Sequence, residues 1–244
     1  MKTPVITGMI DRRILVNYRV NPDVIARILP KPFRPKLVKG MGMAGICLIR
    51  LQNIRPRFLP SFFGMSSENA DHRIAVEWDQ DGETKEGVFV PRRDTSNRIN
   101  TLLGGRIFPG RCSHASFKVK EDNDHFRVVL DSDDGNTHML VDGHVAEQVP
   151  STSVFASVNE ASSFFEKGSL GYSVTPKRGQ FEGLQLHSFN WHVQPLEIEK
   201  VESSYFEDES RFPRGSIELD CALLMRGIRH EWHAKRILCD GPHR

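Results

Sequence analysis

Apolar residues along the chain fall into short runs, alternating or continuous, that are separated by clusters of turn-forming residues. Runs of this length are typical of β-strands, and the Asp-, Asn- and Gly-rich segments 79–82, 121–124 and 133–136 predict hairpin turns between them. The predicted strands are 43–51, 73–78, 85–90, 112–120, 126–130, 137–145, 184–191, 196–206, 216–225 and 231–238. The pattern predicts a chain built mainly from strands joined by short turns.

Helices are few, and their ends carry clear signals. Three are predicted, over 22–29, 95–104 and 157–168. Pro22 fits the first turn of the first helix, where the N–H that proline lacks has no partner within the helix anyway. Ser157 begins the third helix with a capping box. We expect these short helices to lie at the periphery of a sheet.

The fold class follows from the strand pattern. Regular spacing of strands and hairpin turns favours an antiparallel sheet that closes into a barrel or folds into a sandwich. The sequence has no internal repeat, low-complexity tract or Pro/Ser-rich linker. We therefore expect a mainly β protein with a single domain over residues 1–244.

Composition excludes several classes of protein. The 244 residues carry 33 Lys and Arg against 31 Asp and Glu, a net charge of +2 that does not favour nucleic-acid binding. No apolar run approaches the ~20 residues that span a bilayer, and the N-terminus lacks the features of a signal peptide. The four cysteines form no C-x-x-C pair, which fits a reducing compartment. We expect a cytoplasmic protein, with the isolated cysteines serving as core residues rather than nucleophiles.

Motifs for metal binding fail on spacing. His230 and His233 are three residues apart in a predicted strand, so their rings point to opposite faces, whereas a zinc-protease helix needs them four apart. Segment 131–135 resembles a calcium loop but lacks the closing glutamate, which favours a hairpin turn. We predict neither a metal site nor a cofactor.

An excess of arginine between residues 90 and 111 is notable because the whole chain is almost neutral. The segment contains Arg92, Arg93, Arg98, Arg106 and Arg111, with Asp94 as its one acidic residue. A guanidinium group offers a planar fork of donors that matches a carboxylate or a phosphate, so this segment could bind a small anion. The alternative is that the arginines face solvent or pair with acids elsewhere, such as Glu77 or Glu86.

Three histidines are further candidates for a site. His72 and His114 lie in predicted strands, and His187 precedes Trp191 by four residues, which places both on one face of a continuous strand. A neutral imidazole beside a carboxylate or an arginine can act as an acid, a base or a hydrogen-bond donor to a ligand. The alternative for each is a partly exposed strand residue without a role in a site.

Several segments carry a family resemblance. They are 22–30 (PDVIARILP), 186–196 (LHSFNWHVQPL), 212–216 (FPRGS) and 221–226 (CALLMR). Over about residues 10–238 the chain resembles a broad family of poorly characterised bacterial proteins related to acetoacetate decarboxylase. The resemblance implies a cone-like antiparallel β-barrel that encloses a ligand cavity, with a few short helices outside it.

The resemblance also bears on the chemistry. In the decarboxylase, a Gly-Gly-Arg-Glu turn leads to an aromatic-Pro-Lys-Lys sequence whose first lysine forms a Schiff base with the substrate. This chain reads GGRIFPGR over 104–111, with Gly110 in the place of that lysine and Arg111 after it. Arginine stays protonated and cannot replace the amine, so Schiff-base decarboxylation is not expected. The acidic residue of the family corresponds most nearly to Glu68.

These observations leave two main hypotheses. The first is a lyase- or hydrolase-type enzyme acting on a small carboxylate such as a keto acid, without Schiff-base chemistry. Arg106 and Arg111 are the residues proposed to bind the carboxylate of the substrate. Glu68 and His114 are the acid/base candidates. The remaining candidate binding residues are His72, His187 and Trp191.

The second hypothesis is a non-catalytic protein that binds a small molecule in the same cavity. A third, a barrel filled by side chains, would leave no cavity. The sequence does not choose between enzyme and binding protein, and a homo-oligomer is compatible with either.

Overall fold

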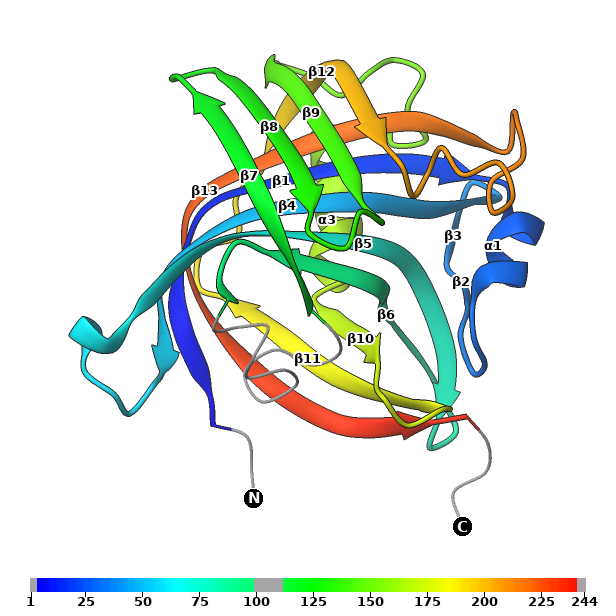
Figure 1. Cartoon of the computed structure of the whole chain (residues 1–244). Helices are drawn as coiled ribbons and strands as arrows, with labels where there is room; N and C mark the ends of the chain where they lie inside the picture. Colours follow the sequence, from blue (N-terminus) through cyan, green and yellow to red (C-terminus); the bar gives the residue numbers. More distant parts are fainter. Residues whose placement is uncertain (1–3, 99–111, 241–244) are drawn as a thin grey trace.

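The computed structural model describes residues 4–98 and 112–240, which form one strongly curved sheet with helices at its sides (Figure 1). The elements, in chain order, are β1 (Ile6–Val20), α1 (Pro22–Ile28), β2 (Arg34–Pro35), β3 (Leu37–Val38), β4 (Met41–Pro56), the 3-10 helix η1 (Ser61–Phe63), β5 (Met65–Gln80), β6 (Glu83–Thr95), β7 (Cys112–Glu121), β8 (His125–Ser132), β9 (His138–Val145), α3 (Val158–Lys167), β10 (Leu170–Val174), β11 (Gln180–Ser188), β12 (Gln194–Ser203) and β13 (Ile217–Cys239). The predicted mainly β class is confirmed.

Hydrogen bonds close the sheet into two rings that share their longest strands. The larger ring runs β5–β6–β7–β8–β9–β12–β13–β1–β4 and returns to β5. The hairpin β10–β11 pairs with β6 on one side and β13 on the other, which closes a smaller ring with β1, β4 and β5 (Figure 1). The shared strands therefore each present one face to the interior of the smaller ring.

Several details differ from the sequence-based expectations. Two strand pairs, β6–β7 and β6–β10, are parallel, because the chain between each pair is long enough to return to the same end of the sheet. The predicted strands 216–225 and 231–238 are one strand, because it pairs with β1 from Ile217 to Trp232, on both sides of Gly227 (φ 65°). Strands β1 and β10 were not predicted.

The helices confirm two of the three predictions. α1 begins at Pro22, and the side chain of Asn21 accepts a hydrogen bond from the N–H of Asp23 (2.9 Å). α3 begins after Ser157, whose hydroxyl accepts a hydrogen bond from the N–H of Glu160 (3.2 Å). For the predicted helix 95–104, Thr95 instead ends strand β6, and residues 99–104 lie outside the described part of the chain.

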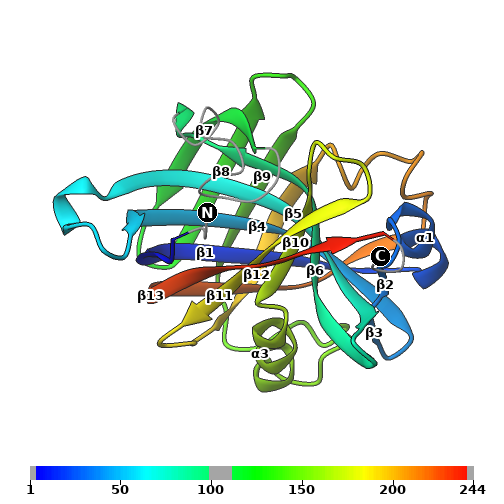
Figure 2. The same cartoon turned by 90° about the horizontal axis from the view of Figure 1, so that it is seen from below.

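The two faces of the shared strands bury two separate apolar clusters. One contains a group of aromatic rings in mutual contact: Phe33, Trp78, Phe89, Tyr172 and Phe181. The other lies beneath α3, which packs Ala161, Phe164 and Phe165 against it (Figure 2). The helix thus covers the face of the sheet on which the candidate site lies.

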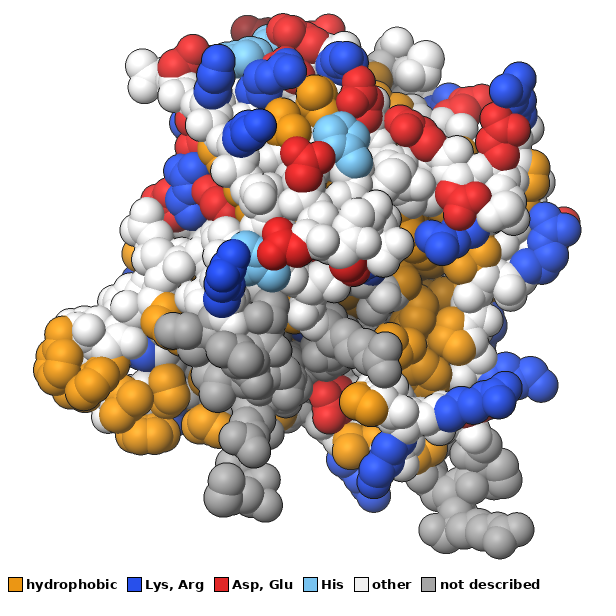
Figure 3. Space-filling view, viewed as in Figure 1, with side chains coloured by type: hydrophobic (Ala, Val, Ile, Leu, Met, Phe, Trp, Pro, Cys, Tyr) orange, Lys and Arg blue, Asp and Glu red, His pale blue; other side chains and the backbone are white. Residues whose placement is uncertain are grey.

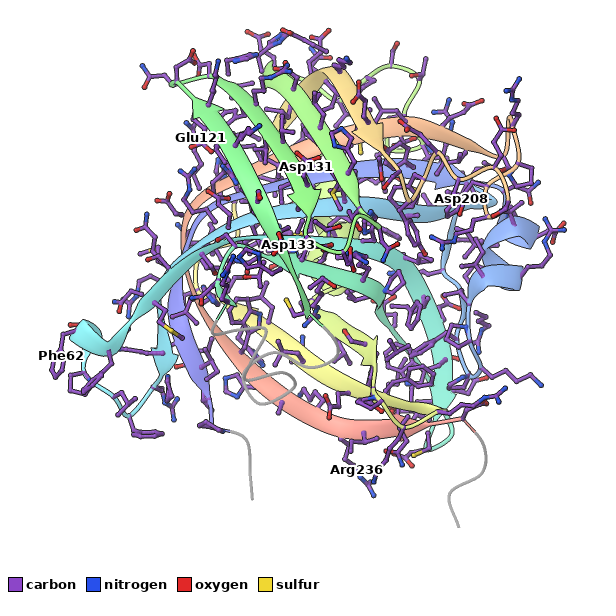
Figure 4. The ribbon with its side chains drawn as sticks, in the orientation of Figure 1. Phe62, Glu121, Asp131, Asp133, Asp208 and Arg236 are labelled. Carbon is purple, nitrogen blue, oxygen red and sulfur yellow. The ribbon has the colours of Figure 1, made fainter. Side chains whose placement is uncertain are left out.

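One apolar surface stands out at the connection between β4 and β5. Phe58, Phe62 and Phe63 expose 76%, 78% and 55% of their surface there. Figure 3 shows hydrophobic side chains gathered at this end of the molecule, and Figure 4 shows Phe62 pointing away from the sheet. Over the meander β7–β9, by contrast, acidic and basic side chains are interspersed (Figure 3). Neither helix of the described residues is long and apolar enough to cross a membrane.

Candidate functional site

A cavity of about 90 Å³ lies within the smaller ring, between the shared strands and the hairpin β10–β11. We call it the arginine cavity. Its polar lining consists of Arg13, Cys47, Asn69, Asp71, Arg73, Arg93, Asp94, Cys112 and Ser169. Apolar side chains, among them Ile49, Leu51, Val90, Leu186 and Trp232, complete its wall.

Strand alternation decides which residues reach the cavity. On β5, Asn69, Asp71 and Arg73 line it. Glu68, next to Asn69, and His72, between Asp71 and Arg73, point to the opposite face, because successive side chains of a strand alternate. β4 likewise contributes the alternate residues Cys47, Ile49 and Leu51.

Arg73 is a buried charge in the wall of the cavity. It exposes 9% of its surface, and its Nε is fully buried with no hydrogen-bond partner among the described residues. Burial lowers the pKa of its guanidinium group, although the carboxylate of Asp71 acts in the opposite direction, so the surroundings do not compensate its charge fully. A buried donor without a hydrogen-bond partner is costly, and a bound anion would remove that cost.

Arg13, on β1, lines the same cavity as Arg73. It exposes 7% of its surface, and its Nη1 also has no hydrogen-bond partner among the described residues. Its Nε–H donates a hydrogen bond to Sγ of Cys47 (3.4 Å), and its guanidinium carbon lies 6.0 Å from the ring centre of Trp191. Two guanidinium groups with donors to spare thus share one small space.

The carboxylates of the cavity are already engaged. Asp71 forms an ion pair with Arg93 (3.5 Å between Oδ1 and Nε). Asp94, whose side chain is fully buried, accepts hydrogen bonds from Arg92 at 2.8 and 3.0 Å. Burial raises the pKa of Asp94, against the effect of Arg92. Asp71 also interacts electrostatically with Arg73, but the described lining has three arginines against two aspartates, so one positive charge remains uncompensated.

Comparison with known proteins places the chain in a family. Residues 9–225 match the model of the DUF2071 family, which is described as an uncharacterized conserved protein. The chain belongs to this family. No curated protein matches the sequence.

Solved structures show which fold this DUF2071 protein has. Acetoacetate decarboxylase from Legionella pneumophila is similar to it, with a TM-score of 0.61 and 14% identity over 97% of this chain and 88% of that chain. The enduracididine biosynthesis enzyme MppR with HEPES bound has a TM-score of 0.61 and 11% identity, over 99% of this chain and 90% of that chain. An acetoacetate decarboxylase-like enzyme from Sphingomonas wittichii RW1 has a TM-score of 0.57 and 10% identity, over 98% of this chain and 93% of that chain. The predicted acetoacetate decarboxylase-like fold is confirmed.

The sequence-predicted acid/base residues lie away from the cavity of this DUF2071 protein. Glu68 sits in an ion network on the opposite face of β5, where it accepts hydrogen bonds from Arg12 (2.6 Å) and Arg50. His114 pairs through Nδ1 with Asp133 (2.8 Å) at the β8–β9 turn, where Figure 4 labels this carboxylate. The structure does not bring the two together.

The predicted binding residues are also dispersed. His72 is completely buried on the opposite face of β5, where its ring lies 4.4 Å from that of Tyr205. His187 is exposed, with its ring 4.6 Å from that of His233. Trp191 approaches the site, because it contacts Arg13 and donates a hydrogen bond to Ser162 on α3 (2.9 Å). Arg106 and Arg111 lie outside the described residues.

Sequence reasoning missed Arg13 and Arg73. A signal existed, because Arg13 directly precedes the apolar run 14–16, and Arg73 lies directly before the apolar residues 74–76. A charged residue inside an otherwise buried strand marks a position that needs a partner. The local excess of arginine over 90–111 drew attention to another part of the chain.

One group of side chains has the geometry of metal ligands. His125, Asp142 and Glu199, on three adjacent strands, place ligand atoms within 4.8 Å of one another. Asp142 is already paired with Arg127, and Oε1 of Glu199 accepts a hydrogen bond from Nδ1 of His144 (3.0 Å). We assign no metal to this exposed cluster.

Proposed function

We propose that this protein binds a small carboxylate, such as a keto acid, in the arginine cavity. The observation that carries the proposal is the pair Arg13 and Arg73, both buried and both with unused hydrogen-bond donors among the described residues. A carboxylate would accept two parallel N–H donors from one guanidinium group and neutralise its charge.

The size of the cavity supports a small ligand. Drug-sized ligands occupy clefts of ~300–1,000 Å³, whereas this cavity measures about 90 Å³. Its wall combines apolar side chains with a few polar groups, as a site for a short acid with an apolar tail requires.

Structural neighbours agree with this ligand class. One of them, the enzyme MppR, is known in complex with pyruvate, at a TM-score of 0.57 and 11% identity to this chain. Another is named as an acetoacetate decarboxylase. Both names refer to small keto acids, and we extend that chemistry to this chain as part of the proposal.

Schiff-base chemistry is not part of the proposed function. None of the described residues that line the arginine cavity is a lysine. The sequence also has Gly110 where the decarboxylase pattern has its reactive lysine. Treatment with borohydride in the presence of acetoacetate should therefore trap no covalent adduct, and a reduced lysine adduct would contradict this part of the proposal.

Binding is tested by thermal unfolding and titration calorimetry with pyruvate and acetoacetate, compared with the uncharged methyl ester of pyruvate. A ligand at 100 times its Kd stabilises the folded state by about 2.7 kcal/mol, so the acids should raise the Tm and the ester should not. Arg73→Met should abolish the effect of the acids. Arg34→Gln is the matched control, since Arg34 is an exposed arginine paired with Asp79 outside the cavity. Equal stabilisation of wild type and Arg73→Met would contradict the proposed site.

A further inference from the structure

We propose that Cys47 is the nucleophile of the arginine cavity, adding reversibly to the carbonyl carbon of a keto acid whose carboxylate is held by Arg73. This inference rests on the proposed function. It reverses the sequence-based expectation that the isolated cysteines are core residues.

The position of Cys47 is the first argument. It lies on β4, exposes 2% of its surface and lines the arginine cavity together with Arg13 and Arg73. Arg13 donates a hydrogen bond to its sulfur (3.4 Å), and the charge of Arg73 interacts with the same thiol. Reactive cysteines are found in electropositive surroundings of this kind, because the thiolate is the nucleophilic form.

Charge balance is the second argument. The described lining holds three arginines, Arg13, Arg73 and Arg93, against two aspartates, so it carries one positive charge in excess. The carboxylate of a keto acid would offset this charge and accept hydrogen bonds from Arg73. In so small a cavity the neighbouring carbonyl carbon would lie close to the sulfur of Cys47.

The other buried cysteines provide the contrast. Cys112 lines the same cavity, but burial together with the nearby carboxylate of Asp71 raises the pKa of its thiol to about 12. Burial, with the neighbouring Asp220, also raises the pKa of Cys221 far above the ordinary value. Of the three, Cys47 is the thiol whose sulfur accepts a hydrogen bond from an arginine, whereas the charges of Arg92 and Arg93 near Cys112 are opposed by Asp71 and Asp94.

The proposed step is an addition without a leaving group. The sulfur electron pair of Cys47 forms a bond to the carbonyl carbon, and the π pair of the C=O bond moves onto its oxygen. The proton released from the thiol ends on that oxygen, which gives a neutral thiohemiketal. No oxidant or other reactant is needed, and the reverse step restores the keto acid.

Alkylation of the intact, folded protein tests the inference, with each cysteine followed by peptide mass spectrometry. Iodoacetate carries the carboxylate that the arginines should attract, and iodoacetamide is its uncharged counterpart. The ratio of the iodoacetate rate to the iodoacetamide rate at Cys47 should exceed the ratio at Cys239 by at least about tenfold. Arg73→Met should bring the two ratios together, and Cys112 should resist both reagents.

The adduct itself is tested by NMR with pyruvate labelled at its carbonyl carbon. In the wild type the label should move from the ketone to the tetrahedral region of the spectrum. In Cys47→Ser it should keep the ketone signal, and pyruvate should raise the Tm of this variant less than that of the wild type, because the covalent bond is lost.

The outcomes separate this inference from the proposed function. If pyruvate stabilises the wild type and not Arg73→Met, but Cys47 is alkylated by neither reagent and no tetrahedral signal forms, the cavity binds acids and the inference about Cys47 is overturned. If pyruvate does not bind at all, both the proposed function and the addition step fail.

Discussion

Arg12 and Arg13 are adjacent in β1, yet their guanidinium groups lie on opposite faces of the sheet. Arg12 is held between the carboxylates of Glu68 and Glu121. Arg13 reaches the arginine cavity, where its closest polar contact is the sulfur of Cys47. One residue of strand register therefore separates a structural ion network from the candidate binding site.

Replacing each of these arginines by methionine should change the free energy of unfolding by different amounts. Arg12→Met removes a buried guanidinium group and leaves Glu68 and Glu121 with Arg50 as their remaining partner among the described residues, so we expect the free energy of unfolding to fall by about 3 kcal/mol. Arg13→Met removes a buried charge that has no acidic partner, so its effect should stay within about 1 kcal/mol. Urea unfolding of both variants measures the difference, and equal losses would contradict it.

The stability of the fold should decrease in acid because of His72. Burial lowers the pKa of His72 from 6.5 to about 3, so below pH 6.5 the unfolded chain binds a proton that the folded chain does not bind. The resulting loss in the free energy of unfolding grows as the pH falls and is complete near pH 3. At pH 5 it amounts to about 2 kcal/mol.

His72→Phe tests this dependence, because a phenyl ring can keep the contacts with Tyr205 and Phe206. Between pH 7 and pH 5 the free energy of unfolding should fall by about 2 kcal/mol less in the variant than in the wild type, measured by urea unfolding at each pH. An identical pH dependence of the two proteins would show that His72 is protonated in the folded state.

The N-terminus of α3 offers a prediction with an internal control. Ser157→Ala removes the hydroxyl that accepts from the N–H of Glu160, and we expect a loss of about 1 kcal/mol in the free energy of unfolding. Ser163→Ala, on the exposed side of the same helix, should be neutral within about 0.5 kcal/mol. Losses of similar size for both variants would argue against a capping role.

Trp191 should affect ligand binding through Arg13, which it contacts from outside the cavity. Trp191→Phe weakens the cation–π contact and removes the hydrogen bond to Ser162, so Arg13 becomes less well oriented. We expect the Kd for pyruvate to rise about two- to fivefold, measured by calorimetry. An unchanged Kd would show that Arg13 is oriented without Trp191.

Local patterns in the sequence were sufficient for much of the fold. The hairpin turns of the meander β7–β9 and the ends of α1 and α3 depend on residues a few positions apart, and these predictions are confirmed. β1 was missed although it is among the most buried strands, because Asp11, Arg12, Arg13 and Asn17 interrupt its apolar run. The union of two predicted strands into β13 depended on its pairing with β1 from Ile217 to Trp232, a long-range contact that an apolar pattern does not show.

The sequence by itself determined the β-rich class and the family resemblance, because these depend on residue type and short-range order. Only the tertiary structure decided the site. Arg13, Cys47, Asp71 and Arg73 come from three strands whose neighbours are set by long-range pairing, and the face that each side chain occupies depends on register. A shift of one residue would exchange Arg13 for Arg12 and Arg73 for His72, so the chemistry of the cavity is a property of the closed sheet.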